Sequence, residues 1–209
     1  MNISVDIDGV LIDRESYQVR KGLEYCKTHG GKMVDPNAYE LYKMFGWKKE
    51  QETAFWNEFL FDYAESPAIG GAAEVLQKLV KQGHTIIINT SRWLTECDDE
   101  KGERMRQKVK SWFEENKLPH DEIVFAKGDK VGVIQAHKCH CHIDDNPPEI
   151  DEIAKHIPVI CFHASYNKNY KGSNVLRATT WDDVYNQIQL LANNLKDLVW
   201  LQRGTRIDF

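Results

Sequence analysis

Two pairs of aspartates, far apart in the sequence, each follow an apolar run that is typical of a buried strand. Asp6 and Asp8 follow the apolar start of the chain, and Asp144 and Asp145 end a second apolar run. Open α/β sheets bind ligands at the carboxyl ends of their strands, so all four carboxylates are expected at one edge. A carboxylate there is costly to desolvate unless it is paired or binds a cation. For the first pair alone, turn-forming aspartates are an equally good interpretation.

Three other polar groups follow predicted strands. Thr90 and Ser91 end one strand, and the next is followed by either Lys127 or Lys130, of which Lys130 is favoured because Asp129 can cap a helix before it. Four carboxylates at one edge would repel one another, and a divalent cation removes that conflict. Oxygen ligands favour Mg²⁺, while a hydroxyl and an ammonium group can bind the oxygens of a phosphate.

The elements that would position these groups alternate between helix and strand after residue 67. This alternation predicts an α/β fold, a Rossmann-like doubly wound parallel sheet with helices on both faces. Strands are expected at the start of the chain and at 84–89, 122–126, 139–143 and 157–162.

Residues 14–66 interrupt this pattern. They follow the first strand, show helical spacing of apolar and aromatic residues, and contain no predicted strand. Asp35 and Pro36 indicate the start of the second of three helices. This length exceeds what a crossover needs, so we expect a small inserted helical cap at 14–66 and a core formed by 1–13 and 67–209.

Aromatic residues of the expected cap could pack its core or stack against a ligand. For most of them packing is the favoured interpretation. Trp47 is the exception, because it follows Gly46 in a predicted turn and has no place on either helical face. We therefore expect Trp47 to face the mouth of the site and contact a substrate.

Composition narrows the functional classes. The net charge of −5, from 27 basic and 32 acidic residues, gives no indication of a nucleic-acid polymer or a membrane as partner. The start of the chain has no leader pattern and no apolar run is long enough to span a bilayer, so we expect a cytoplasmic protein. The oligomeric state stays open. So does the tail from Asp197 to Phe209, whose apolar side chains could dock on the core or on another subunit.

The motifs resemble those of the haloacid dehalogenase-like (HAD) phosphohydrolase superfamily. Asp6-Ile7-Asp8-Gly9-Val10 resembles the first family motif, Thr90 the second, and Ile143-Asp144-Asp145-Asn146-Pro147 the fourth. A helical insertion after the first strand matches the placement of the family's cap. The stretches Pro67-Ala68-Ile69-Gly70-Gly71-Ala72 and Thr90-Ser91-Arg92 are similar to the 5'-nucleotidase and deoxyribonucleotidase branch.

The resemblance implies a role for each motif residue. Asp6 would be the nucleophile that forms an aspartyl phosphate, and Asp8 the general acid and base. Mg²⁺ would be bound by Asp6, the main-chain carbonyl of Asp8, Asp144 and Asp145. Thr90 and Lys130 would stabilise the transferring phosphoryl group, with Ser91 and Arg92 as further substrate contacts.

These roles imply a Mg²⁺-dependent phosphomonoesterase acting on a small phosphorylated substrate, with nucleoside monophosphates as the leading class. A phosphatase for a sugar phosphate or another small metabolite phosphate is the alternative on the same core. A non-catalytic phosphate-binding protein is a third hypothesis, and the presence of both a nucleophile and its acid/base argues against it.

Overall fold

A parallel sheet forms the centre of the molecule. The computed structural model describes the backbone of residues 1–204 and the side chains of residues 1–195. Within that part, six parallel strands lie in the order β3-β2-β1-β4-β5-β6. Their bounds are Asn2–Val5 (β1), Thr85–Thr90 (β2), Glu122–Phe125 (β3), Cys141–Asp144 (β4), Val159–Phe162 (β5) and Val175–Ala178 (β6). This confirms the predicted α/β fold class.

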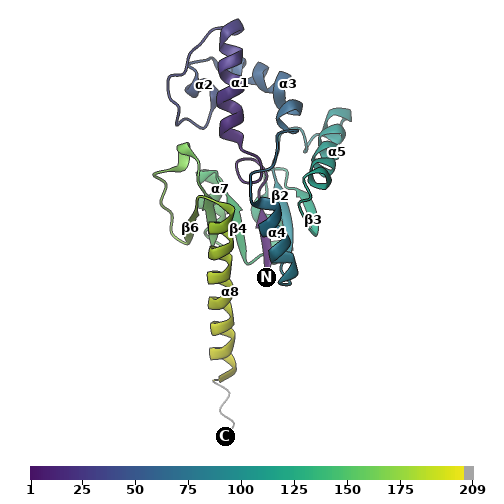
Figure 1. The fold of residues 1–209 in the computed structure, drawn as a ribbon, viewed down its shortest axis with the longest axis vertical. Helices are drawn as coiled ribbons and strands as arrows, with labels where there is room; N and C mark the ends of the chain where they lie inside the picture. The colour runs from purple at the N-terminus through teal and green to yellow at the C-terminus, as the bar shows by residue number, and fades with distance from the viewer. Residues whose placement is uncertain (205–209) are drawn as a thin grey trace.

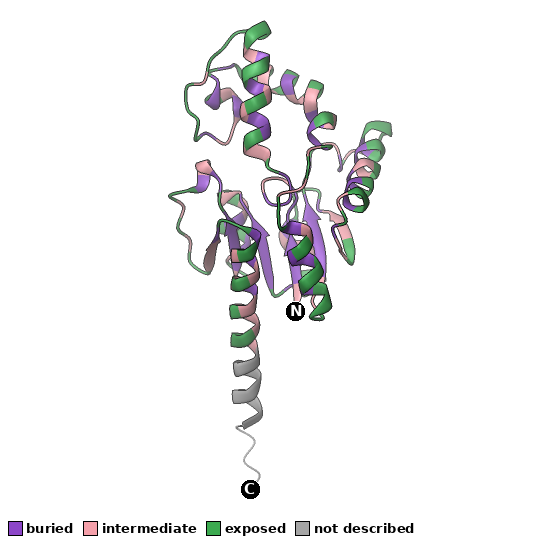
Figure 2. Cartoon of the chain, viewed as in Figure 1, coloured by how far each residue is buried: buried purple, intermediate pink, exposed green. Residues whose placement is uncertain are grey.

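Helices cover both faces of the sheet (Figure 1). The larger core includes residues of α4 (Ala72–Lys81), α5 (Glu100–Glu115) and α8 (Trp181–Gly204), and a smaller core includes residues of α6 (Lys130–Ala136) and α7 (Pro147–Ile153). Alternate strand residues enter the two cores, since Ile86 and Ile88 pack in the larger one and Ile87 in the smaller one. The strands are accordingly buried on both sides, as Figure 2 shows.

Three helices lie beyond the carboxyl ends of the strands, between β1 and α4 in the sequence. They are α1 (Arg14–His29), α2 (Leu41–Met44) and α3 (Lys49–Tyr63). They pack around the fully buried rings of Phe45 and Phe55, and Gly22 of α1 lies so close to Phe45 that a larger side chain would collide with the ring. These three helices lie within residues 14–66, the range expected for the helical insertion. The division into a cap domain and a core domain stays a prediction.

One local prediction is wrong, and one strand was missed. Asp35 does not begin a helix; its Oδ1 accepts a hydrogen bond from the Asn37 backbone N–H at 2.9 Å, which makes a turn, and α2 begins only at Leu41. Strand β6 was not expected. It is short and only partly buried, it lies at the sheet edge, and it therefore carries a weak apolar pattern.

The end of α8 lies partly outside the described side chains. The expectation that Leu198, Val199 and Trp200 dock on the core or on another subunit concerns side chains beyond residue 195. No helix within the described chain combines the length and the apolar character that crossing a membrane requires.

Candidate active site

The sheet topology brings the ends of β1 and β4 together. These strands are neighbours at the centre of the sheet, with Val5 paired to Ile143, and the next residue of each is an aspartate. The backbone N–H of Asp6 donates to the carbonyl oxygen of Ile143 at 3.0 Å, which continues the pairing to the end of the strands. From β1 the chain adds β2 and β3 on one side of the sheet and then β4, β5 and β6 on the other. Ligands bind in sheets of this kind where the strand order reverses in this way.

Three buried carboxylates meet at this edge. Asp6, Asp144 and Asp145 each offer an oxygen atom, and these atoms lie within 4.8 Å of one another. Lys130, which begins α6, inserts its ammonium group between two of them, with Nζ 3.1 Å from Asp6 Oδ1 and 2.7 Å from Asp144 Oδ2. Lys127 lies elsewhere; its side chain is exposed and its Nζ is 3.6 Å from Asp98 Oδ1. The structure therefore places Lys130 in the cluster, as favoured from the sequence.

The pKa values of the three carboxyls diverge. Burial raises the pKa of Asp6 well above its usual range, with Lys130 opposing and the charge of Asp144 adding to the rise. Burial and the charge of Asp144 also raise the pKa of Asp145, to about 7. Burial acts in the same direction on Asp144, but Lys130 and His142 outweigh it and lower its pKa below the usual range. Two of the three carboxyls therefore hold a proton more readily than a free carboxyl does.

The donor set of this cluster fits a magnesium ion. Its ligand atoms are carboxylate oxygens, which Mg²⁺ prefers. A divalent charge there would oppose the burial and the repulsion that raise the pKa values of Asp6 and Asp145. Gly9 leaves the space that this packing needs, since it has φ +82° and any Cβ there would overlap the carboxylate of Asp145.

Asp8 lies outside the three-carboxylate cluster. Its carboxylate forms an ion pair with Arg92, whose Nε and Nη2 donate to its two oxygens, Nε at 3.2 Å. Burial raises the pKa of Asp8, but the Arg92 guanidinium outweighs burial and holds that pKa below the usual range. The fully buried Thr90 hydroxyl accepts a hydrogen bond from the backbone N–H of Arg92 at 3.2 Å, which fixes the turn after β2.

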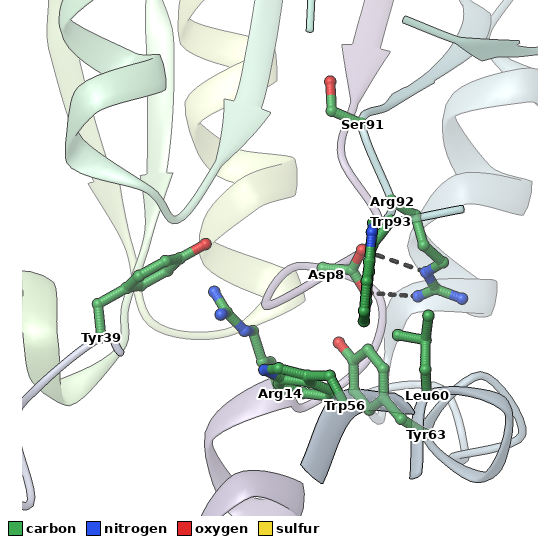
Figure 3. A pocket seen from close by; sticks show the side chains of 9 residues that line it. All are labelled: Asp8, Arg14, Tyr39, Trp56, Leu60, Tyr63, Ser91, Arg92 and Trp93. Carbon is green, nitrogen blue, oxygen red and sulfur yellow. Dashed lines mark hydrogen bonds and ion pairs between the residues drawn. The ribbon is translucent and has the colours of Figure 1, made fainter. Parts of the chain in front are cut away.

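Asp8 opens onto a cavity of about 310 Å³ beneath the three helices (Figure 3). This volume is within the range that small-molecule ligands occupy. Four of its nine lining residues are aromatic, and the exposed Ser91 lies at one side. The lining residues are Asp8, Arg14, Tyr39, Trp56, Leu60, Tyr63, Ser91, Arg92 and Trp93. We call this cavity the aromatic pocket.

Trp47 does not line the aromatic pocket, so the expected mouth-facing position is wrong. Its side chain is buried, stacks on Phe45 with ring centroids 4.8 Å apart, and donates from Nε1 to the carbonyl oxygen of Gly30 at 3.2 Å. The tryptophans that line the pocket are Trp56 and Trp93. Trp56 lies on α3, and helical spacing alone did not reveal which face of that helix is turned to the pocket. Trp93 could have been found, because it lies three residues after Thr90, at a strand end that the sequence indicates.

A chain of buried hydrogen bonds lies below Asp144 and was missed from the sequence. Asn89 Nδ2 donates to Ser4 Oγ at 3.2 Å, Ser4 Oγ lies 2.8 Å from His142 Nδ1, and His142 Nε2 lies 2.9 Å from Asp144 Oδ2. Burial lowers the pKa of His142 and so favours the neutral ring, while Asp144 opposes this effect. With Nε2 protonated, every donor in the chain has an acceptor and points toward Asp144. The sequence signal for this chain of hydrogen bonds was the presence of the polar residues Ser4, Asn89 and His142 within apolar strands.

Sequence comparison gives matches over nearly the whole chain. Residues 1–195 match the family described as "5' nucleotidase, deoxy (Pyrimidine), cytosolic type C protein". A protein of Bacillus cereus named "Putative nucleotidase" is 29% identical over 198 residues, covering 88% of this chain and 96% of the relative. A "Putative nucleotidase" of Bacillus subtilis is 26% identical over 209 residues, covering 95% of this chain and 97% of the relative.

Solved structures show the same fold at lower identity. A HAD-superfamily hydrolase from Ehrlichia chaffeensis has a TM-score of 0.52 at 18% identity and covers 91% of this chain and 97% of its own. A beta-phosphoglucomutase from Clostridium difficile has a TM-score of 0.59 at 14% identity and covers 93% of this chain and 97% of its own.

The raised pKa of Asp145 predicts a pH-dependent loss of stability in the metal-free protein. Its folded-state pKa of about 7 lies above the unfolded value, so its contribution is present at pH 4 and is lost as the pH rises to 7. The slope from this group approaches about 1.4 kcal/mol per pH unit. Asp145→Asn should remove this slope, as urea unfolding in chelator from pH 4 to 8 would show. Parallel curves for wild type and variant would contradict the assignment.

Proposed function

Because this chain belongs to the family described as 5' nucleotidase, deoxy (pyrimidine), cytosolic type C, and is a HAD-type phosphatase, we propose that it hydrolyses nucleoside monophosphates in a Mg²⁺-dependent reaction through an aspartyl phosphate on Asp6. The observation that carries this proposal is the buried cluster of Asp6, Asp144, Asp145 and Lys130 beside the aromatic pocket that Asp8 enters. A nucleophile, a cation site and an acid/base then lie around one position where a phosphate can bind.

Asp6 is the proposed nucleophile. It follows the central strand, so the rigid sheet holds its carboxylate at the edge where substrate arrives. Its attack on phosphorus forms the aspartyl phosphate and breaks the bond to the leaving oxygen. Lys130 would neutralise negative charge on the phosphoryl oxygens, and the hydroxyl groups of Thr90 and Ser91 would donate hydrogen bonds to them.

Asp6, Asp144, Asp145 and the main-chain carbonyl of Asp8 would hold the magnesium ion. When bound, Mg²⁺ keeps the carboxylates ionised and draws electron density from the phosphoryl oxygens. Lys130 and His142 keep Asp144 ionised without it, so this carboxylate is ready to bind a cation.

Asp8 is the proposed acid and base. The Arg92 guanidinium favours the ionised carboxylate, which suits the second step, where Asp8 takes a proton from the water that attacks the aspartyl phosphate. The first step needs a protonated Asp8 to donate to the leaving oxygen. The negative charge of a dianionic phosphate beside Asp8 would raise the pKa of that carboxyl against the effect of Arg92, which would favour the protonated form.

The aromatic pocket supports a nucleoside as the leaving group. Trp56, Trp93 and Tyr63 offer ring faces near Asp8, and a nucleobase stacks well on such surfaces. The alternative substrate class, sugar phosphates, has no ring of this kind to stack. We also propose a cytoplasmic location, in agreement with the description of the matched family as cytosolic.

Removing the Asp6 carboxylate should abolish turnover. Asp6→Asn cannot form the aspartyl phosphate, so we expect kcat to fall by at least about 1,000-fold while the thermal unfolding temperature stays near that of the wild type. Release of inorganic phosphate from a nucleoside monophosphate measures the change. Asp13→Asn, at the exposed cap of α1, is the matched control and should stay active. Substantial activity in Asp6→Asn would reject the covalent route.

Removing the metal should stop the reaction reversibly. Dialysis against a chelator is expected to bring phosphate release to background, and added Mg²⁺ should restore it, because the carboxylates repel one another without a divalent ion. Full activity in chelator would contradict a metal-dependent site.

A substrate panel decides between the substrate classes. We expect kcat/KM for nucleoside 5'-monophosphates to exceed that for sugar phosphates by at least tenfold, because stacking in the aromatic pocket adds binding free energy. Initial rates across both classes at saturating Mg²⁺ provide the comparison. A preference for sugar phosphates would favour the alternative, and no turnover with either class would favour a phosphate-binding protein.

A further inference from the structure

The aromatic pocket contains a second arginine that the proposed mechanism does not use. Arg14, the first residue of α1, lines this pocket and also a second cavity of about 280 Å³ that includes Gly9 and Tyr166. Figure 3 shows its guanidinium between Tyr39 and Asp8 in this view. Arg14 therefore lies where the two cavities meet, on the side of the cap that is closest to the catalytic carboxylates.

The guanidinium of Arg14 has no acidic partner. Arg92 is paired with Asp8, whereas no carboxylate of the described residues lies within ion-pair distance of Arg14. Its Cζ instead lies 3.8 Å from the ring centroid of Tyr39. With the Gln18 amide oxygen turned toward it, Gln18 accepts from Nε at 3.2 Å and from Nη2 at 3.3 Å. Gln18 and Tyr39 thus hold this side chain in place, and neither of them neutralises its charge.

Arg14 acts electrostatically on both sides of the reaction centre. Its charge is among the influences that lower the pKa of Asp8, after that of Arg92. It also opposes the rise in the pKa of Asp145 that burial and Asp144 cause. Arg14 therefore lies close enough to both Asp8 and Asp145 to influence a phosphate bound between these two carboxyls.

The charges of the site leave a role for this cation. The three clustered carboxylates and Lys130 together carry a net charge of −2, which a divalent ion balances. Asp8 and Arg92 balance each other. A dianionic phosphate then enters a site without surplus positive charge, except for Arg14, which is the remaining cation among the residues that line the aromatic pocket.

We propose that Arg14 binds the phosphate of the substrate, opposite Lys130, and that Arg92 serves Asp8 instead. This assignment rests on the proposed phosphatase function and replaces the earlier expectation that Arg92 contacts substrate. Guanidinium groups bind phosphate with paired hydrogen bonds, and the stacking of Arg14 on Tyr39 holds its plane in one orientation before substrate arrives.

Calorimetric titration of the Mg²⁺-loaded protein with inorganic phosphate tests this role without turnover. Arg14→Gln should raise the dissociation constant for phosphate by about 10- to 100-fold, the loss expected for a charge-assisted hydrogen bond. Arg14→Lys keeps the charge and should lose less. Arg20→Gln is the matched control, because Arg20 is an exposed arginine of the same helix that lies against Tyr17. Thermal unfolding checks each variant, and Arg14→Met serves if Arg14→Gln does not fold.

Kinetics with two leaving groups complete the test. KM for 4-nitrophenyl phosphate and for a nucleoside monophosphate should rise by the same factor in Arg14→Gln, because both carry the same phosphate. Unchanged phosphate binding in a folded variant, or an effect confined to one leaving group, would overturn the assignment. Failure of the wild type to hydrolyse nucleotides would reject the nucleotidase proposal alone, since the phosphate titration does not depend on it.

Discussion

Repulsion between carboxylates on neighbouring parallel strands is the constraint on which this structure depends. The pairing of β1 with β4 makes Asp6 and Asp144 neighbours, and Asp145 follows directly. Burial increases the cost, because each charge loses its hydration. Lys130 offsets part of the cost from α6, and the donor set accommodates a divalent cation for the rest. The same crowding of carboxylates would provide the affinity for such a cation.

The polar chain from Asn89 to Asp144 crosses three adjacent strands on the face that α6 covers. Asn89 belongs to β2, Ser4 to β1 and His142 to β4, and Asn89 also donates to the carbonyl oxygen of Lys130 at 3.1 Å. The chain of hydrogen bonds thus links β1, which Asp6 follows, to the start of α6, which carries Lys130. Such hydrogen bonds position metal ligands and are satisfied only in one strand register.

The sequence was sufficient for the fold class and for the strand ends, because both follow from local patterns. Apolar runs followed by aspartates identified Asp6 and Asp144. The N-cap residue of α6, Asp129, favoured Lys130 over Lys127. The position of Trp47 was not predictable, because it depends on which way α1 and α3 pack. Arg14 carried no signal for the same reason: only the docking of the cap turns the first residue of α1 toward the site.

The segment that contains η1 (Ser165–Asn167) contacts the chain around the start of α1 and the turn before α2. Ser165 bonds to Glu15 and to the carbonyl oxygen of Pro36, and Lys168 bonds to Asn37 at 3.0 Å. These are polar contacts near the surface, and water replaces each one at a net cost of only about 0.5–1.5 kcal/mol. The edge-to-face contact between the rings of Tyr39 and Tyr166, with centroids 5.0 Å apart, adds an apolar element to this attachment. The segment after β5 is therefore held to the three helices mainly by groups that can exchange their partners for water.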